Sequence, residues 1–143
     1  MVYGMSPLDP DPWSSTVIGP AIAVHRRLGP AVFENVYHAC LAYEIRRAGL
    51  RVESNVPLPV RYDELVFQLG YRLDLLVENS LVVELKAVTT VLEVHHTQVN
   101  TYLKLSGCPV GLLINFKVPI LKDRITRFVN SAGARISDER KQT

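Results

Sequence analysis

Apolar residues follow two different periods along the chain, and the change of period separates helical segments from strand-like ones. A helical period, with apolar residues three or four positions apart, occurs over residues 14–28, 33–48 and 92–106. Strands are expected over residues 52–62, 65–77, 81–88 and 110–116. Residues 120–129 fit a last strand or a short helix equally well. This order predicts a mixed α/β fold in which helices flank a sheet.

Glycine and proline mark where these elements stop. Gly29-Pro30, Gly49 and Gly107 follow the three helical segments. Pro57 and Pro59 favour an edge position for the first strand, because proline cannot donate to a central ladder. The unbroken apolar run 110–116 is typical of a strand covered on both faces.

The length and the charge set wide limits. A chain of 143 residues is close to the common size of one domain. We expect a flexible arm over 1–13, a single domain over 14–130 and a polar tail over 131–143. Sixteen Lys plus Arg and fourteen Asp plus Glu give a formal charge of +2. This charge neither indicates nor excludes a nucleic-acid partner.

The cysteines and the apolar runs narrow the class of protein. Cys40 and Cys108 are far apart and form no CxxC pair, so zinc-finger patterns are absent. Both are expected to be buried free thiols. The first residues do not resemble a secretory signal, and no apolar run is long enough to span a membrane. We expect a cytoplasmic protein without a membrane partner.

The stretch 71–86 carries the most informative pattern. A three-residue hairpin loop centred on Asn79 predicts the strand pairs Val77–Leu81, Asp74–Glu84 and Arg72–Lys86. Because side chains alternate between the faces of a strand, one face is apolar: Leu73, Leu75, Val77, Leu81, Val83 and Leu85. The opposite face holds Arg72, Asp74, Leu76, Val82, Glu84 and Lys86.

Two carboxylates on this second face point to a metal. Asp74 and Glu84, directly opposite each other, would lie about 5 Å apart and repel. A hard divalent cation such as Mg²⁺ between them removes the repulsion. Lys86 points the same way and could orient water or neutralise a phosphate, as metal-assisted phosphodiester hydrolysis requires. The alternative is an ordinary exposed sheet face of mixed charge.

Further candidates lie on the neighbouring helices. Gln98 and Tyr102 share a helical face, with His95 close by. Gln98 could hold water or a phosphate, or face solvent; Tyr102 could stack on a base, or pack in the core. Glu34 could join a site, or favour the start of its helix. His25 could be functional, or a hydrogen-bonded core histidine.

Val17–Phe116 resembles the GxxExxY proteins, a group within the PD-(D/E)xK nuclease superfamily. The matching segments are VIGPAIAVHRRLGPAVFENVYHACLAYEIRRAGL, YRLDLLVENSLVVELKAV, HHTQVNTYLKLSG and VGLLINF. The superfamily's motifs map onto Asp74, Glu84-Leu85-Lys86 and Gln98 to Tyr102. The resemblance implies a restriction-endonuclease-like fold and Mg²⁺-dependent nuclease chemistry, with Mn²⁺ as a substitute. It also implies that the Leu85 carbonyl and Glu34 join the metal shell.

One position departs from the motif that names the family. The glycine three residues before the glutamate is Ala31 here, whereas Glu34 and Tyr37 are present. Alanine adopts a positive φ only at a cost that glycine avoids. If the turn needs that conformation, the placement of Glu34 changes, unless Gly29 compensates.

The leading hypothesis is a divalent-metal nuclease that acts on DNA, or less favourably on RNA. Asp74 and Glu84 would bind metal, and Lys86 would assist the water or the scissile phosphate. Gln98 would orient substrate, and Glu34 would bind a second metal or position water. Tyr102, Arg72 and His95 are the candidate substrate contacts. Six arginines could form a phosphate track, or be solvated surface: Arg26, Arg27, Arg46, Arg47, Arg51 and Arg72. The alternative is a nucleic-acid-binding or assembly module without turnover; a homodimer is also left open.

Overall fold

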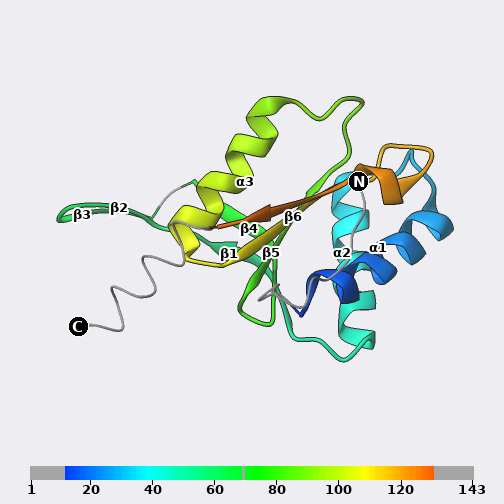
Figure 1. Cartoon of the computed structure of the whole chain (residues 1–143), viewed down its shortest axis with the longest axis horizontal. Helices are drawn as coiled ribbons and strands as arrows, with labels where there is room; N and C mark the ends of the chain where they lie inside the picture. Colours follow the sequence, from blue (N-terminus) through cyan, green and yellow to red (C-terminus); the bar gives the residue numbers. More distant parts are fainter. Residues whose placement is uncertain (1–11, 69, 131–143) are drawn as a thin grey trace.

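A computed structural model describes residues 12–68 and 70–130 of the chain. Its centre is a sheet of β1 (Val52–Pro57), β4 (Arg72–Val77), β5 (Leu81–Lys86), β6 (Val110–Asn115) and β7 (Ile125–Val129), in that spatial order. Helices α1 (Ser14–Leu28) and α2 (Glu34–Arg47) pack on one face, and α3 (Glu93–Ser106) packs on the other (Figure 1). This architecture confirms the predicted α/β fold, restriction-endonuclease-like, with a mixed sheet between helices.

The sheet is mixed because one connection crosses over. β5 and β6 run parallel, and α3 provides the long connection between them. The other neighbouring pairs are antiparallel. All six residues of β6 are buried, as the unbroken apolar run predicted. The crossover places α3 directly over the face that carries Asp74 and Glu84.

Two apolar clusters fill the space on the two sides of the sheet. The cluster beneath α1 and α2 includes Val17, Ala21, Tyr37, Leu41, Ile45, Leu75, Val77, Val83, Leu85, Leu112 and Ile114. The cluster beneath α3 includes Leu58, Leu73, Leu76, Val82, Val99, Tyr102, Leu103 and Leu113. The predicted alternation holds except at Leu73, which belongs to the second cluster. Leu73 lies beyond residues 75–77, the part of β4 that pairs with β5.

Two predicted strands are interrupted. Residues 52–62 divide into β1 and β2 (Val60–Tyr62), and residues 65–77 divide into β3 (Leu65–Phe67) and β4. Pro57 is the last residue of β1, and Pro59 has no N–H with which to continue the ladder, so the chain leaves the main sheet there. β2 and β3 pair around the predicted Asp63–Glu64 turn as a separate hairpin that projects from the body (Figure 1). β1 is an edge strand, as expected.

The remaining expectations have mixed outcomes. Residues 120–129 contain both alternatives in succession, a 3₁₀ helix η1 (Leu121–Arg124) followed by β7. Both cysteines are free thiols; Cys108 is buried, but Cys40 is only half-buried because it sits on the outer part of the α1–α2 layer. The predicted arm and tail lie outside the described residues, apart from positions 12 and 13. Within the described part, none of the helices is long and apolar enough to cross a membrane.

Candidate metal and phosphate site

The predicted hairpin register is correct near the loop and ends one pair before the site. Residues 75–77 pair with 81–83 as expected, Val77 opposite Leu81. The predicted pairs Asp74–Glu84 and Arg72–Lys86 do not form. Instead, Asp74 Oδ2 accepts a hydrogen bond from the backbone N–H of Leu85 at 2.8 Å. A side chain therefore bridges the strands where backbone pairing stops.

Asp74 also lacks a partner on the opposite side of β4. The pairing with β1 includes Leu73 and Leu75 but skips the position between them. Asn55, which would face Asp74, has a left-handed backbone with φ of 53°. The carbonyl of Asp74 instead accepts a hydrogen bond from His38 Nε2 at 2.9 Å. This local irregularity resembles the bulges by which sheets redirect side chains beside functional sites.

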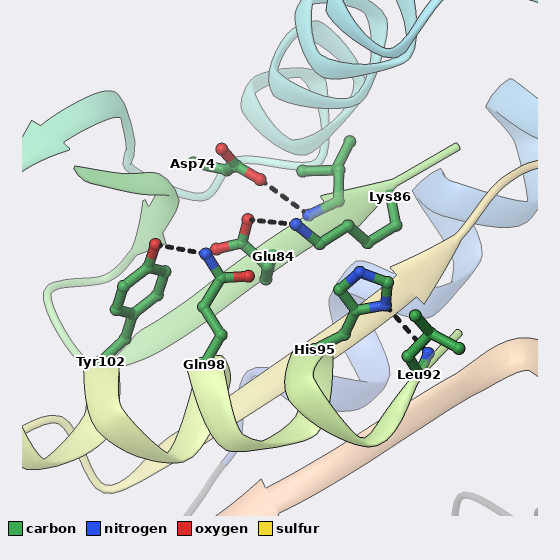
Figure 2. Close-up of polar contacts among 8 residues, drawn as sticks. Asp74, Glu84, Lys86, Leu92, His95, Gln98 and Tyr102 are labelled. Carbon is green, nitrogen blue, oxygen red and sulfur yellow. Dashed lines mark hydrogen bonds and ion pairs between the residues drawn. The ribbon is translucent and has the colours of Figure 1, made fainter. Parts of the chain in front are cut away.

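Glu84 is the most unusual polar group of the described part of the chain. It is 4% exposed. Its Oε1 lies 3.9 Å from Lys86 Nζ, and its Oε2 is buried without a hydrogen-bond partner. Figure 2 shows both side chains in the space between the sheet and α3. Burial and then the neighbouring Asp74 carboxyl raise the pKa of Glu84 to about 9, although Lys86 opposes the shift.

These donors fit a hard cation. The unpartnered oxygen of Glu84 and the second oxygen of Asp74 offer the carboxylate ligands that Mg²⁺ takes, and Mg²⁺ commonly keeps several waters beside one or two carboxylates. In the described ranges, no three His, Cys, Asp or Glu side chains gather closely enough to hold a metal by themselves. The two carboxylates therefore suit an ion that keeps part of its shell of water. Leu85 lies between Glu84 and Lys86 on β5, so its backbone is close to both charged side chains.

Glu34 approaches the same group from α2. Partial burial and then the charge of Asp74 raise its pKa, whereas Lys86 and a backbone hydrogen bond with Ala87 lower it. The concern about Ala31 does not apply, because the left-handed conformation is at Gly29 (φ 76°) and Ala31 does not adopt it. The helix therefore starts at Glu34 with its carboxyl near the other charged side chains.

Tyr37 has a structural role. It is fully buried, and its ring stacks on Phe116 at 4.5 Å between centroids. Its hydroxyl donates to the carbonyl of Gly29 and accepts the N–H of Val32. The tyrosine thus fixes the turn that precedes α2, the helix that begins at Glu34.

α3 contributes polar groups on the side facing the carboxylates. Gln98 Nε2 donates to the Tyr102 hydroxyl at 2.8 Å (Figure 2). Tyr102 is 5% exposed, which matches the core-packing alternative, and burial followed by the charge of Glu84 raises the pKa of its hydroxyl. Gln98 is half-buried, so it does not simply face solvent.

A hollow of about 430 Å³ adjoins these residues. It is lined by Tyr71, Lys86, Val94, His95, Thr97, Gln98, Thr101 and Tyr102. His95 also accepts the N–H of Leu92 through Nδ1 at 3.0 Å, so it helps to begin the helix. Arg72 is not among the lining residues; it is exposed and opposite Pro57. The structure therefore brings His95 to the hollow, but not Arg72.

Two contacts were missed by sequence reasoning. His38 lies four residues after Glu34 on α2, a spacing that places both on one helical face. Tyr71 precedes β4 and stands edge-on to Tyr102, with 6.0 Å between ring centroids. The helical spacing could have indicated His38. Nothing in the local pattern marks Tyr71, because its place depends on packing against α3.

The other side chains considered earlier have ordinary surroundings. His25 is buried and donates from Nε2 to the carbonyl of Val118 at 2.7 Å, which is the core-histidine alternative. The six arginines are all exposed. Two of them pair with nearby acids, Arg47 with Glu44 and Arg51 with Glu78. Their exposure and pairing match the solvated-surface alternative.

Comparison with known proteins shows which family the chain is similar to. A model of the PD-(D/E)XK nuclease superfamily matches residues 11–128, which confirms the predicted superfamily. The finer resemblance to GxxExxY proteins stays a prediction. No curated protein sequence matches. A solved structure titled "Crystal structure of SSO0001" is 21% identical, with a TM-score of 0.49, and the match covers 89% of this chain and 66% of that one.

Proposed function

This chain belongs to the PD-(D/E)XK nuclease superfamily, and from that premise we propose that it hydrolyses phosphodiester bonds of nucleic acid with a divalent cation. One observation carries the proposal. A buried glutamate, Glu84, has an oxygen without a partner beside a second carboxylate, Asp74, and an ammonium group, Lys86. A buried unpaired carboxylate costs the fold stability, and a role in binding or chemistry is one reason why a native protein retains such a group.

The cation would be held by Asp74 and Glu84, with the Leu85 carbonyl as a third ligand. When bound, Mg²⁺ or Mn²⁺ supplies Lewis-acid polarisation of the phosphate and lowers the pKa of water. Ligation would require an ionised carboxylate, so Glu84 would have to give up its proton to solvent in order to hold the ion. The raised pKa of Glu84 is thus a property of the metal-free protein.

The other residues act on the substrate and on water. Lys86 projects from the end of β5 and neutralises charge that develops on the phosphate. Gln98, held by the Tyr102 hydroxyl, orients a phosphate oxygen or the attacking water. Glu34, whose pKa is raised by burial and by the charge of Asp74, would accept a proton from water or help to hold a second ion.

Several finer expectations belong to this proposal. DNA is the preferred polymer and RNA the second choice, and the protein acts in the cytoplasm as one domain over residues 14–130. A homodimer is the alternative to a monomer. Light scattering on the purified protein distinguishes these two states, and equal concentrations of labelled DNA and RNA rank the polymers.

The direct test is cleavage by the purified protein with Mg²⁺ or Mn²⁺, using single-stranded, duplex and branched DNA and RNA. Asp74→Asn and Lys86→Ala should each abolish cleavage, whereas Glu64→Gln, at an exposed carboxyl in the projecting hairpin, should not. Intact substrates throughout would contradict the proposal. Nucleic-acid binding that ignores both metal and the Glu84→Ala change would instead identify a module without turnover.

A further inference from the structure

Two exposed aromatic side chains lie on either side of the candidate site. Phe33 is 82% exposed, and Tyr71 is 44% exposed. Tyr71 lines the hollow that contains Lys86, and Phe33 lines a second hollow of about 420 Å³ that contains Glu34 and Ala87. Lys86 and Ala87 are consecutive residues, so both hollows adjoin the same end of β5.

Phe33 has no evident structural purpose. It occupies the N-cap position of α2, where its side chain makes no capping hydrogen bond. Helices favour Ser, Thr, Asp or Asn at this position, because their side chains can satisfy the first free N–H groups. An aromatic ring that neither caps the helix nor enters the core leaves a large apolar face in solvent, next to Glu34.

Each hollow also contains a lysine. Lys86 lines the hollow of Tyr71, and Lys117 lines the hollow of Phe33. A polynucleotide alternates flat bases with anionic phosphates, so an aromatic ring paired with an ammonium group matches one nucleotide. Two such pairs on either side of a phosphate-cleaving site match consecutive nucleotides of one strand. In a duplex the base faces are already stacked and cannot reach these rings.

We propose that the substrate is a single-stranded polynucleotide, or an unpaired stretch of one, whose bases on either side of the cleaved phosphate stack on Phe33 and Tyr71. The inference rests on the proposed function for its reaction, but its recognition is separable from cleavage. The rings provide faces that tolerate any base, so little sequence preference is expected. Stacking carries no information about the sugar, and DNA and RNA strands both enter the test.

The test measures binding without cleavage, by fluorescence anisotropy of labelled oligonucleotides in EDTA. Single-stranded DNA or RNA should bind more tightly than a blunt duplex of the same sequence. Phe33→Ala and Tyr71→Ala should each weaken single-strand binding by about 5- to 150-fold, which is the usual effect of losing one stacked base. Tyr71→Phe keeps the ring and should bind normally.

Tyr43→Ala is the matched control, because Tyr43 is 57% exposed and lines a different hollow, between α1 and α2. A second measurement avoids variants altogether. The wild-type protein should bind a strand with consecutive abasic sites more weakly than the intact strand. Tyr71→Ala should also weaken binding less on the abasic strand than on the intact strand, because the abasic strand has no base to stack on Tyr71.

The outcomes separate this inference from the proposed function. Duplex binding as tight as single-strand binding overturns it, even if the protein cleaves DNA with Mg²⁺. Aromatic variants that bind as Tyr43→Ala does overturn it as well. Single-strand preference that depends on Phe33 and Tyr71 supports it even if no metal ion produces cleavage, in which case the nuclease proposal alone fails.

Discussion

The two faces of the central sheet differ in whether their buried polar groups have hydrogen-bond partners. Beneath α1 and α2, the His25 ring donates to the Val118 carbonyl and the Tyr37 hydroxyl bridges Gly29 and Val32. Beneath α3, Glu84 is as deeply buried, yet one of its oxygens has no partner. Satisfied groups stabilise a fold, whereas an unsatisfied one lowers stability. We therefore expect the residues beneath α1 and α2 to stabilise the fold, and the polar residues beneath α3 to bind.

The largest expected difference between the faces concerns activity. Asp74→Asn keeps the size of the side chain but removes the charge that a cation requires, so cleavage should fall by about 10³-fold or more. The melting temperature should change little, because Asn can still accept the Leu85 N–H. Initial rates with Mn²⁺ and calorimetric melting measure both quantities. A variant that retains full activity would show that this face is not the site.

The opposite face should show the reverse behaviour. Leu41 is fully buried in the α1–α2 cluster, so Leu41→Ala should lower the free energy of unfolding by about 2–5 kcal/mol. Cleavage by the molecules that stay folded should be nearly unchanged, since Leu41 touches the core rather than the carboxylates. Urea unfolding and rates at low temperature test this pair of results. A stable but inactive Leu41→Ala protein would contradict the expectation that residues beneath α1 and α2 affect stability rather than activity.

A smaller effect is expected at His38, which joins the two regions. Its hydrogen bond holds the backbone carbonyl of Asp74, the residue of β4 that pairs with neither β1 nor β5. His38→Leu should weaken Mn²⁺ binding by about 10- to 100-fold, as losses of supporting contacts around metal ligands usually do. His38→Gln, which can place an N–H at a similar distance, should restore most of the affinity. Equal weakening in both variants would show that the hydrogen bond is unimportant.

A pH dependence of stability is also expected in the metal-free protein. The pKa of Glu84 is raised from its ordinary 4.5 to about 9 in the folded state. The folded protein therefore binds more protons than the unfolded chain between these values, and stability falls as pH rises through this window. Glu84→Gln should flatten the decline. Unfolding in EDTA at pH 5, 7 and 8 measures it, and a wild-type stability that rises over this range contradicts the account.

Sequence patterns predicted the fold well where a single period dominates. The three helices, the buried β6 and the hairpin pairing at Val77–Leu81 follow from apolar spacing and loop length. The interrupted strands were missed because the chain leaves the sheet after Pro57 to form a separate hairpin, which alternation alone does not reveal. The prolines marked only an edge.

The site was predictable in its residues but not in its geometry. Spacing brought Asp74, Glu84 and Lys86 to one face, although the pairing of Asp74 with Glu84 does not form. A side-chain hydrogen bond to Leu85 replaces it, and such a bond has no sequence signature. The helical spacing from Glu34 could have indicated His38, whereas the position of Tyr71 depends on packing against α3 and has no signal in the local sequence pattern.

We propose that the unsatisfied carboxylate of Glu84 and its neighbour Asp74 hold a divalent ion. Titration of Mn²⁺, followed by the loss of the free-ion electron paramagnetic resonance signal, tests it without any substrate. We expect saturable binding by the wild-type protein, loss of binding in Glu84→Gln and in Asp74→Asn, and unchanged binding in Glu64→Gln. Equal binding by all four proteins, or none by the wild type at millimolar Mn²⁺, would contradict it.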